Sequence, residues 1–117
     1  MVADLSFISL KLIFKSIGNL LDGDCIEGIF FIKPQFEVGK DKVSKGGVVR
    51  NPKFHTEAIE SVIYAAKNFQ WNIIVLLASL LVGPAGNHEY LAWMCFSSES
   101  NPRINIEYIQ NLVNETL

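Results

Sequence analysis

Three charged side chains stand where predicted strands end or begin, and together they could handle a proton. Asp4 follows a short apolar run, Lys33 follows a longer one, and Glu89 opens a third. In an open α/β sheet, ligands bind outside the carboxyl ends of the parallel strands. A strand that returns antiparallel after the turn at 83–87 starts at that same edge. The sequence therefore predicts a carboxylate, an amine and a second carboxylate along one edge of a sheet.

An amine set between two carboxylates can accept or share the proton of a hydroxyl that attacks an electrophile. The spacing alone leaves a plainer alternative open. In that alternative Lys33 is solvated, Asp4 caps a turn and Glu89 lies on a surface strand. The choice between a proton-handling site and three unrelated surface residues depends on the strands and loops that carry them.

Apolar periodicity predicts alternating strands and helices, and hence an α/β layered sheet with crossover connections. The run at 25–32 lacks polar alternation, which predicts a strand buried on both faces. The last two strands are joined by a short turn and must pair antiparallel. The predicted elements are a strand stub at 1–4, a helix over 10–21, a strand over 25–32, a helix from Pro52 to Phe69, strands over 71–82 and 89–96, and a helix over 104–117. This order corresponds to one half of a doubly wound sheet, with parallel strands and a final antiparallel strand.

The segment 35–51 is predicted to be a polar loop beside Lys33, longer than ordinary connectors and therefore functional or mobile. It gathers positive charge at Lys40, Lys42, Lys45 and Arg50. Such a loop suits contacts with nucleic-acid phosphates, which dominate the affinity of such complexes. A simply solvated loop explains the same composition, and the sequence does not separate the two.

Composition limits the classes of protein to which this chain can belong. The chain has 117 residues, of which 50% are hydrophobic and 19% charged, as expected for one globular domain. A net charge of −2 argues against a protein that binds nucleic acid through overall charge alone. The longest apolar stretch, 73–82, is far shorter than the roughly 20 residues that cross a bilayer. No signal peptide is recognised, so a cytoplasmic protein without membrane contact is expected.

The cysteines and histidines do not predict a metal site. Cys25 and Cys95 lie inside apolar runs and lack the spacing of metal ligands. They are expected to be reduced thiols in the core. His55 and His88 also lack a partner at ligand spacing, so no bound metal is predicted.

Three stretches, taken together, resemble the signatures of the TlyA-type (hemolysin A) proteins. These are residues 3–10 (ADLSFISL), residues 33–40 (KPQFEVGK) continued by 45–52 (KGGVVRNP), and residues 83–93 (GPAGNHEYLAW). They occur in the order and at about the spacing expected for that family. The family is similar to the FtsJ group of S-adenosylmethionine-dependent RNA 2′-O-methyltransferases, whose fold is Rossmann-like.

The resemblance implies roles for the three charged residues. FtsJ-type enzymes carry a Lys-Asp-Lys-Glu tetrad, and by motif match Asp4 is its aspartate, Lys33 its second lysine and Glu89 its glutamate. Lys33 is then expected to act on the proton of a ribose 2′-hydroxyl, with Asp4 orienting it and Glu89 completing the polar network. Ser6 and Phe7 are expected near S-adenosylmethionine. The resemblance also implies rRNA or a ribosomal subunit as partner.

Two of the family's expected features are missing from the sequence. The first tetrad lysine has no counterpart before Asp4, and no glycine-rich cofactor turn follows a first strand. The expectation is that residues 1–117 form a partial methyltransferase domain without its cofactor-binding half or S4-like RNA-binding domain. Such a chain is expected to be inactive and not to bind S-adenosylmethionine alone. The alternative is a non-catalytic RNA- or protein-binding remnant that assembles with a second copy or with the missing half.

Overall fold

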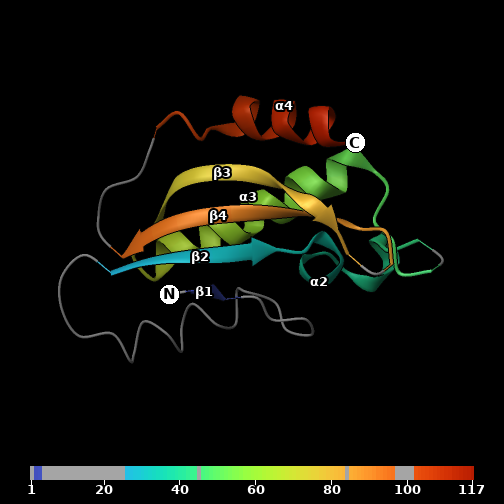
Figure 1. The fold of residues 1–117 in the computed structure, drawn as a ribbon, viewed down its shortest axis with the longest axis horizontal. Helices are drawn as coiled ribbons and strands as arrows, with labels where there is room; N and C mark the ends of the chain where they lie inside the picture. The colour runs from blue at the N-terminus through green and yellow to red at the C-terminus, as the bar shows by residue number, and fades with distance from the viewer. Residues whose placement is uncertain (1, 4–25, 45, 84, 97–101) are drawn as a thin grey trace.

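The computed structural model describes residues 2–3, 26–44, 46–83, 85–96 and 102–117, which form one sheet with helices packed against it (Figure 1). The helix expected over 10–21, with Ser9 as its cap, lies outside the described residues. The described elements are β1 (Val2–Ala3), β2 (Ile26–Ile32), α2 (Pro34–Glu37), the 3-10 turn η1 (Lys40–Lys42), α3 (Pro52–Asn68), β3 (Trp71–Val82), β4 (His88–Phe96) and α4 (Ile106–Thr116).

Local sequence explains where the longest helix begins and ends. The side chain of Asn51 accepts a hydrogen bond from the backbone N–H of Lys53, and Pro52 occupies the first helical turn, where it costs no hydrogen bond. At the other end, Gln70 takes a positive φ of 66°, which turns the chain directly into β3. The predicted helix start at Pro52 and the predicted strand over 71–82 are confirmed.

The strands lie in the order β1-β2-β4-β3, so the last strand in sequence fills the space between β2 and β3. β4 pairs antiparallel with both of its neighbours, which confirms the predicted antiparallel pairing of the last two strands. Because both neighbours oppose β4, β3 runs in the same direction as β2. The parallel pairing that the structure describes joins β1 to β2 through Val2 and Ala3. β4 begins at His88, one residue earlier than predicted.

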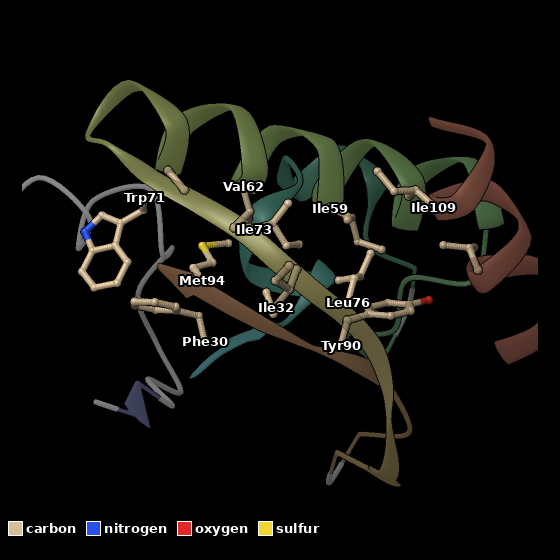
Figure 2. Close-up of a cluster of buried hydrophobic side chains, with 13 residues drawn as sticks. Phe30, Ile32, Ile59, Val62, Trp71, Ile73, Leu76, Tyr90, Met94 and Ile109 are labelled. Atoms are coloured by element: carbon tan, nitrogen blue, oxygen red, sulfur yellow. The ribbon is translucent and has the colours of Figure 1, made fainter. Parts of the chain in front are cut away.

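The hydrophobic core lies between one face of the sheet and the helices α3 and α4 (Figure 2). Alternate residues of each strand enter it, because side chains along a strand point to opposite faces. On β2 these are Phe30 and Ile32, both fully buried. Phe30 meets Trp71 of β3 edge-on, with 5.2 Å between the ring centroids. The helices contribute mainly Ile59, Val62, Ala66, Ile109 and Val113.

The opposite face of the sheet corrects the expectation that the run 25–32 is buried on both faces. Ile29 is 38% exposed, Trp93 43% and Leu77 52%. Ile29 pairs with Trp93, so the apolar side chains continue from β2 to β4. The expectation was wrong because α3 and α4 both pack on the other face. Ile29, Leu77 and Trp93 define what we call the open sheet face.

The segment 35–51 was predicted to be a loop and contains more local structure than that. Pro34 starts α2, whose single turn closes where the N–H of Val38 donates to the carbonyl of Pro34. A 3-10 turn follows, and Ser44 then bridges to Val48 across a turn in which Gly46 and Gly47 have positive φ angles of 90° and 80°. Glycine fits those two positions because other residues rarely adopt such angles. None of the helices among the described residues is long and apolar enough to cross a membrane.

Candidate functional site

Lys33 and Glu89 meet at the edge of the sheet where β2 ends. Lys33 directly follows β2 and is the N-cap residue of α2, while Glu89 is the second residue of β4. Lys33 Nζ lies 3.7 Å from Glu89 Oε1, and the two side chains are only 10% and 15% exposed. Because the pair is largely shielded from solvent, salt screens it less than it would screen a surface pair. The structure thus brings together two of the three predicted site residues.

A tight turn places Glu89. The N–H of Gly83 donates to the carbonyl of Asn87, at 2.9 Å, and closes the connection between β3 and β4. A side-chain carbon added at Gly83 would lie 3.7 Å from Glu89 Oε1 and 3.5 Å from the Asn87 carbonyl oxygen. These are ordinary van der Waals distances, so the Glu89 carboxylate packs closely against the turn.

Asp4, the third predicted site residue, lies outside the described residues, as do Ser6 and Phe7. Their expected places beside Lys33 and beside the cofactor stay predictions. The two described residues of β1 pair with β2, with Ala3 opposite Phe30. β1, which ends directly before Asp4, therefore lies beside β2, which ends directly before Lys33.

The predicted basic loop is less uniform than its composition suggests. Lys42 Nζ donates to Glu57 Oε2 of α3 at 2.8 Å and lies 5.3 Å from the centre of the Phe54 ring. The hydrogen bond to Glu57 raises the pKa of Lys42, and the same bond lowers the pKa of Glu57. The charge of Lys42 is thus largely compensated within the protein, whereas Arg50 is exposed. The side chains of Lys40 and Lys45 lie outside the described part of the chain.

Two polar residues near the site, His55 and Asn87, are buried, which the sequence did not predict. His55 is fully buried and Asn87 is 2% exposed. The sequence indicated that Asn87 shapes a turn, and it gave His55 no role beyond an improbable metal ligand. The histidine follows Asn51-Pro52, a helix-start signal that places it in the first turns of α3 and facing inward. Among the described residues, no group of three or more His, Cys, Asp or Glu side chains gathers as a metal site would require.

The comparison with known protein families decides what kind of fold this is. Residues 1–96 match the model of the FtsJ-like methyltransferases.

The chain belongs to the FtsJ-like methyltransferase family.

Curated relatives agree with the resemblance seen in the sequence. Over 93 residues the chain is 40% identical to the 16S/23S rRNA (cytidine-2′-O)-methyltransferase TlyA of Mycobacterium tuberculosis, covering 80% of this chain and 34% of the relative. It is 36% identical over 98 residues to YqxC of Bacillus subtilis, named as a candidate rRNA methyltransferase, covering 82% and 34%. Hemolysin A of Brachyspira hyodysenteriae is 34% identical over 95 residues, covering 78% and 38%. The chain thus spans about a third of the length of the curated relatives it matches.

Solved structures support the same conclusion. A candidate hemolysin from Lactococcus lactis superposes with a TM-score of 0.86 at 34% identity, covering 99% of this chain and 55% of that one. A candidate hemolysin from Streptococcus thermophilus gives 0.87 at 30% identity, covering 97% and 40%. The fold of this chain therefore corresponds to a part of each of those longer solved chains.

The family implies S-adenosylmethionine as cofactor, but the described residues of this FtsJ-like chain do not by themselves fit it. Nucleotide-type cofactors are typically held by a glycine-rich turn between a strand end and a helix start. Here β2 runs into α2 through Lys33-Pro34, and the turn after β3 leads to another strand. A groove of about 470 Å³ lies between α3 and α4, lined by polar side chains such as Glu57 and Gln110, and it includes neither Lys33 nor Glu89.

Proposed function

We propose that this chain supplies the proton-handling side of an rRNA ribose 2′-O-methyltransferase site. Lys33 acts on the proton of the ribose 2′-hydroxyl, and Glu89 holds the lysine in place. Asp4 is assigned the orienting role that its motif match gives it. The single observation that supports this proposal most is the nearly buried Lys33–Glu89 pair, with 3.7 Å between Nζ and Oε1, at the end of a sheet in an FtsJ-like fold.

In the proposed methyl transfer, these residues contribute mainly through their position and charge. In its neutral form the amine can accept the hydroxyl proton while the oxygen forms its new bond, and it thereby becomes an ammonium. The carboxylate stabilises the positive charge that develops on the lysine. S-adenosylmethionine would supply the methyl group, and we propose that the rest of a TlyA-type protein binds it. This division implies a partial domain in 1–117, inactive until joined to the part that relatives carry beyond the matched third.

The substrate side of the proposal is rRNA within a ribosomal subunit, as the names of two relatives suggest. Arg50 is exposed on the segment that follows α2 and is the described member of the basic loop best placed to meet a phosphate. Lys40 and Lys45 are proposed to join it, while Lys42 contributes less because Glu57 neutralises it. A ribosomal substrate places the protein in the cytoplasm.

The test is a fusion that restores a full-length protein. The 117-residue chain is joined behind the preceding part of the Bacillus subtilis relative YqxC, in place of the segment it matches. The fusion is incubated with tritiated S-adenosylmethionine and ribosomal subunits, and methylated ribose is mapped on the RNA. Transfer that depends on Lys33 supports the proposal. A folded fusion that binds the cofactor but leaves the 2′-hydroxyls unmodified contradicts it.

A second candidate function is supported by the open sheet face. Exposed apolar side chains that continue across two strands are typical of surfaces that bind another protein. Trp93, at 43% exposed, is the largest of them. This alternative is a module that assembles with a partner chain, either a second copy or the remaining half of the domain. This assembly function is favoured over catalysis if the fusion transfers no methyl group while the isolated chain forms a complex of defined stoichiometry.

A further inference from the structure

Two buried residues near Glu89 are linked to Val49 in the loop before α3: Asn87, which directly precedes β4, and Tyr90, which follows Glu89 on that strand. Asn87 accepts a hydrogen bond from the backbone N–H of Val49 at 2.9 Å, and its own amide donates to the carbonyl of Gly47 at 2.7 Å. On the other side of Glu89, the Tyr90 hydroxyl lies 3.0 Å from His55 Nδ1. His55 Nε2 in turn lies 2.7 Å from the carbonyl oxygen of Val49.

These contacts select the tautomer of the neutral imidazole. A carbonyl oxygen can only accept, so the proton of the ring sits on Nε2, which donates to Val49. Nδ1 is then the acceptor, and Tyr90 donates its hydroxyl proton to it. Burial lowers the pKa of His55, which favours the same neutral form. The N–H and the C=O of Val49 are thus both held, the first by Asn87 and the second by His55.

The arrangement connects three pieces of chain that are distant in sequence. Asn87 also accepts from the N–H of Gly83 through its backbone carbonyl, at 2.9 Å, and so closes the β3–β4 turn. Figure 1 shows this turn at the end of the sheet where β2 leads into α2. Buried polar groups cost free energy unless they are hydrogen-bonded, so a fully bonded set of this kind favours one arrangement over others.

We propose that Asn87 is a positioning residue for Glu89, with His55 and Tyr90 as its counterpart on the other side. By fixing the start of β4 against Val49, this set keeps Glu89 Oε1 at its distance from Lys33 Nζ. The inference rests on the proposed function, since it assigns these residues a part in the same proton-handling site. Misplacement of a reacting group by about 1 Å can cost as much as 10²-fold in rate.

The first part of the test needs no activity. Amide hydrogen exchange is measured on the full 117-residue chain and on Asn87→Ala. The Val49 amide is expected to exchange about tenfold faster in the variant, as the loss of one buried hydrogen bond implies. Asn105→Ala is the matched control, because Asn105 likewise accepts a backbone N–H, that of Tyr108 at 3.0 Å, but caps α4. Unchanged exchange at Val49 in Asn87→Ala overturns the proposal.

The second part measures methyl transfer in the YqxC fusion. Asn87→Ala is expected to lower kcat by about tenfold or more and to displace the pH profile of kcat in the same direction as Glu89→Gln. A merely structural role lowers the whole profile through loss of folded protein and does not displace it. A kcat within about threefold of wild type, or a profile that only scales, overturns the positioning role.

If Asn87→Ala does not fold, Tyr90→Phe replaces it, since it removes a single hydroxyl, which contacts His55 and also Thr116. It is expected to displace the profile in the same direction, by a smaller amount. A wild-type fusion that transfers no methyl group refutes the proposed function and the positioning role that depends on it. The exchange at Val49 still decides separately whether Asn87 holds the loop.

Discussion

Lys33 and Glu89 face each other one step beyond the last paired residues of β2 and β4. The antiparallel register ends at Ile32 opposite Tyr90, and continuing it by one residue on each strand brings Lys33 opposite Glu89. The register of the sheet thus places the two residues opposite each other, and their side chains come within 3.7 Å. A slip of one residue by either strand would send that strand's side chain to the opposite face.

The YqxC fusion should lose most of its methyl transfer when Lys33 is replaced by Ala. Loss of a group that acts on the proton typically costs about 10²–10⁴-fold in rate. Lys33→Arg is expected to fail nearly as badly, because a guanidinium keeps its proton and has a different shape. Glu89→Gln should cost less, since it keeps the shape and one acceptor. The measurement is single-turnover transfer at saturating cofactor and RNA.

Lys67→Ala is the control for that experiment, because it removes an exposed lysine from the last turn of α3. It should leave the rate unchanged. If Lys33→Ala keeps more than about a third of the wild-type rate, far above the range for loss of a general base, the catalytic assignment is wrong. Lys33 would then only anchor the start of α2.

The isolated chain should not bind S-adenosylmethionine measurably. In this class of fold most cofactor contacts come from a glycine-rich turn after the first strand, and the described residues contain no such strand-turn-helix. Titration calorimetry on the folded chain checks this expectation, with the YqxC fusion as the positive control. Binding to the isolated chain in the micromolar range would show that the cofactor contacts lie in residues 1–117.

Stability should fall as the pH drops below about 6.5 because of His55. Burial is the main cause that lowers its pKa from the ordinary 6.5; His88 adds to this, and the bond to Val49 opposes it. Between the folded and unfolded pKa values the unfolded chain holds more protons, so the free energy of unfolding rises with pH there and levels off above. Urea unfolding at about pH 7.5 and about pH 5.5 measures the change.

The variant that isolates this effect is His55→Gln, which retains a donor for the Val49 carbonyl but does not titrate. Its stability should be lower at neutral pH and should depend less on pH below 6.5 than that of the wild type. His88→Gln should keep most of the wild-type dependence. An identical acid profile for His55→Gln and wild type would mean that another group is responsible.

The open sheet face should drive self-association of the isolated chain. Ile29 and Trp93 are paired neighbours, and Leu77 of β3 adds to the same face. Trp93→Ser is expected to shift the chain toward the monomer in sedimentation velocity. Tyr64→Ser, which removes a 70% exposed aromatic ring from α3, is the matched control and should change little. A wild-type chain that stays monomeric at high concentration would contradict the prediction.

The sequence predicted best what local signals determine. Asn51-Pro52 marked the start of α3, and a predominantly apolar run marked β3 over all its residues. The meeting of Lys33 with Glu89 followed from strand direction alone. The insertion of β4 between β2 and β3 was not predicted, because strand order depends on contacts between distant segments.

Three features that the sequence did not reveal depend on contacts between distant segments. An apolar sequence is compatible with a strand that is covered on one face or on both. The exposure of Ile29 and Trp93 therefore could not be predicted from the sequence of the strands. The pairing of Lys42 with Glu57 joins residues 15 positions apart, and its 2.8 Å distance depends on how the segment folds back onto α3. Asn87 looked like a turn residue, and its bonds to Gly47 and Val49 reach 40 and 38 positions back along the chain.

The placement of β4 has a consequence for the order in which the protein can fold as it is synthesised. β2 and β3 leave the ribosome first, yet they are not neighbours, and each has an edge that only residues 88–96 can fill. The sheet therefore cannot close until the final strand arrives, and pairings of such long sequence separation form slowly. A chain ending before His88 would keep two unsatisfied inner edges, with Lys33 present and no acid opposite it. Completion of the sheet and assembly of the Lys33–Glu89 pair are one event.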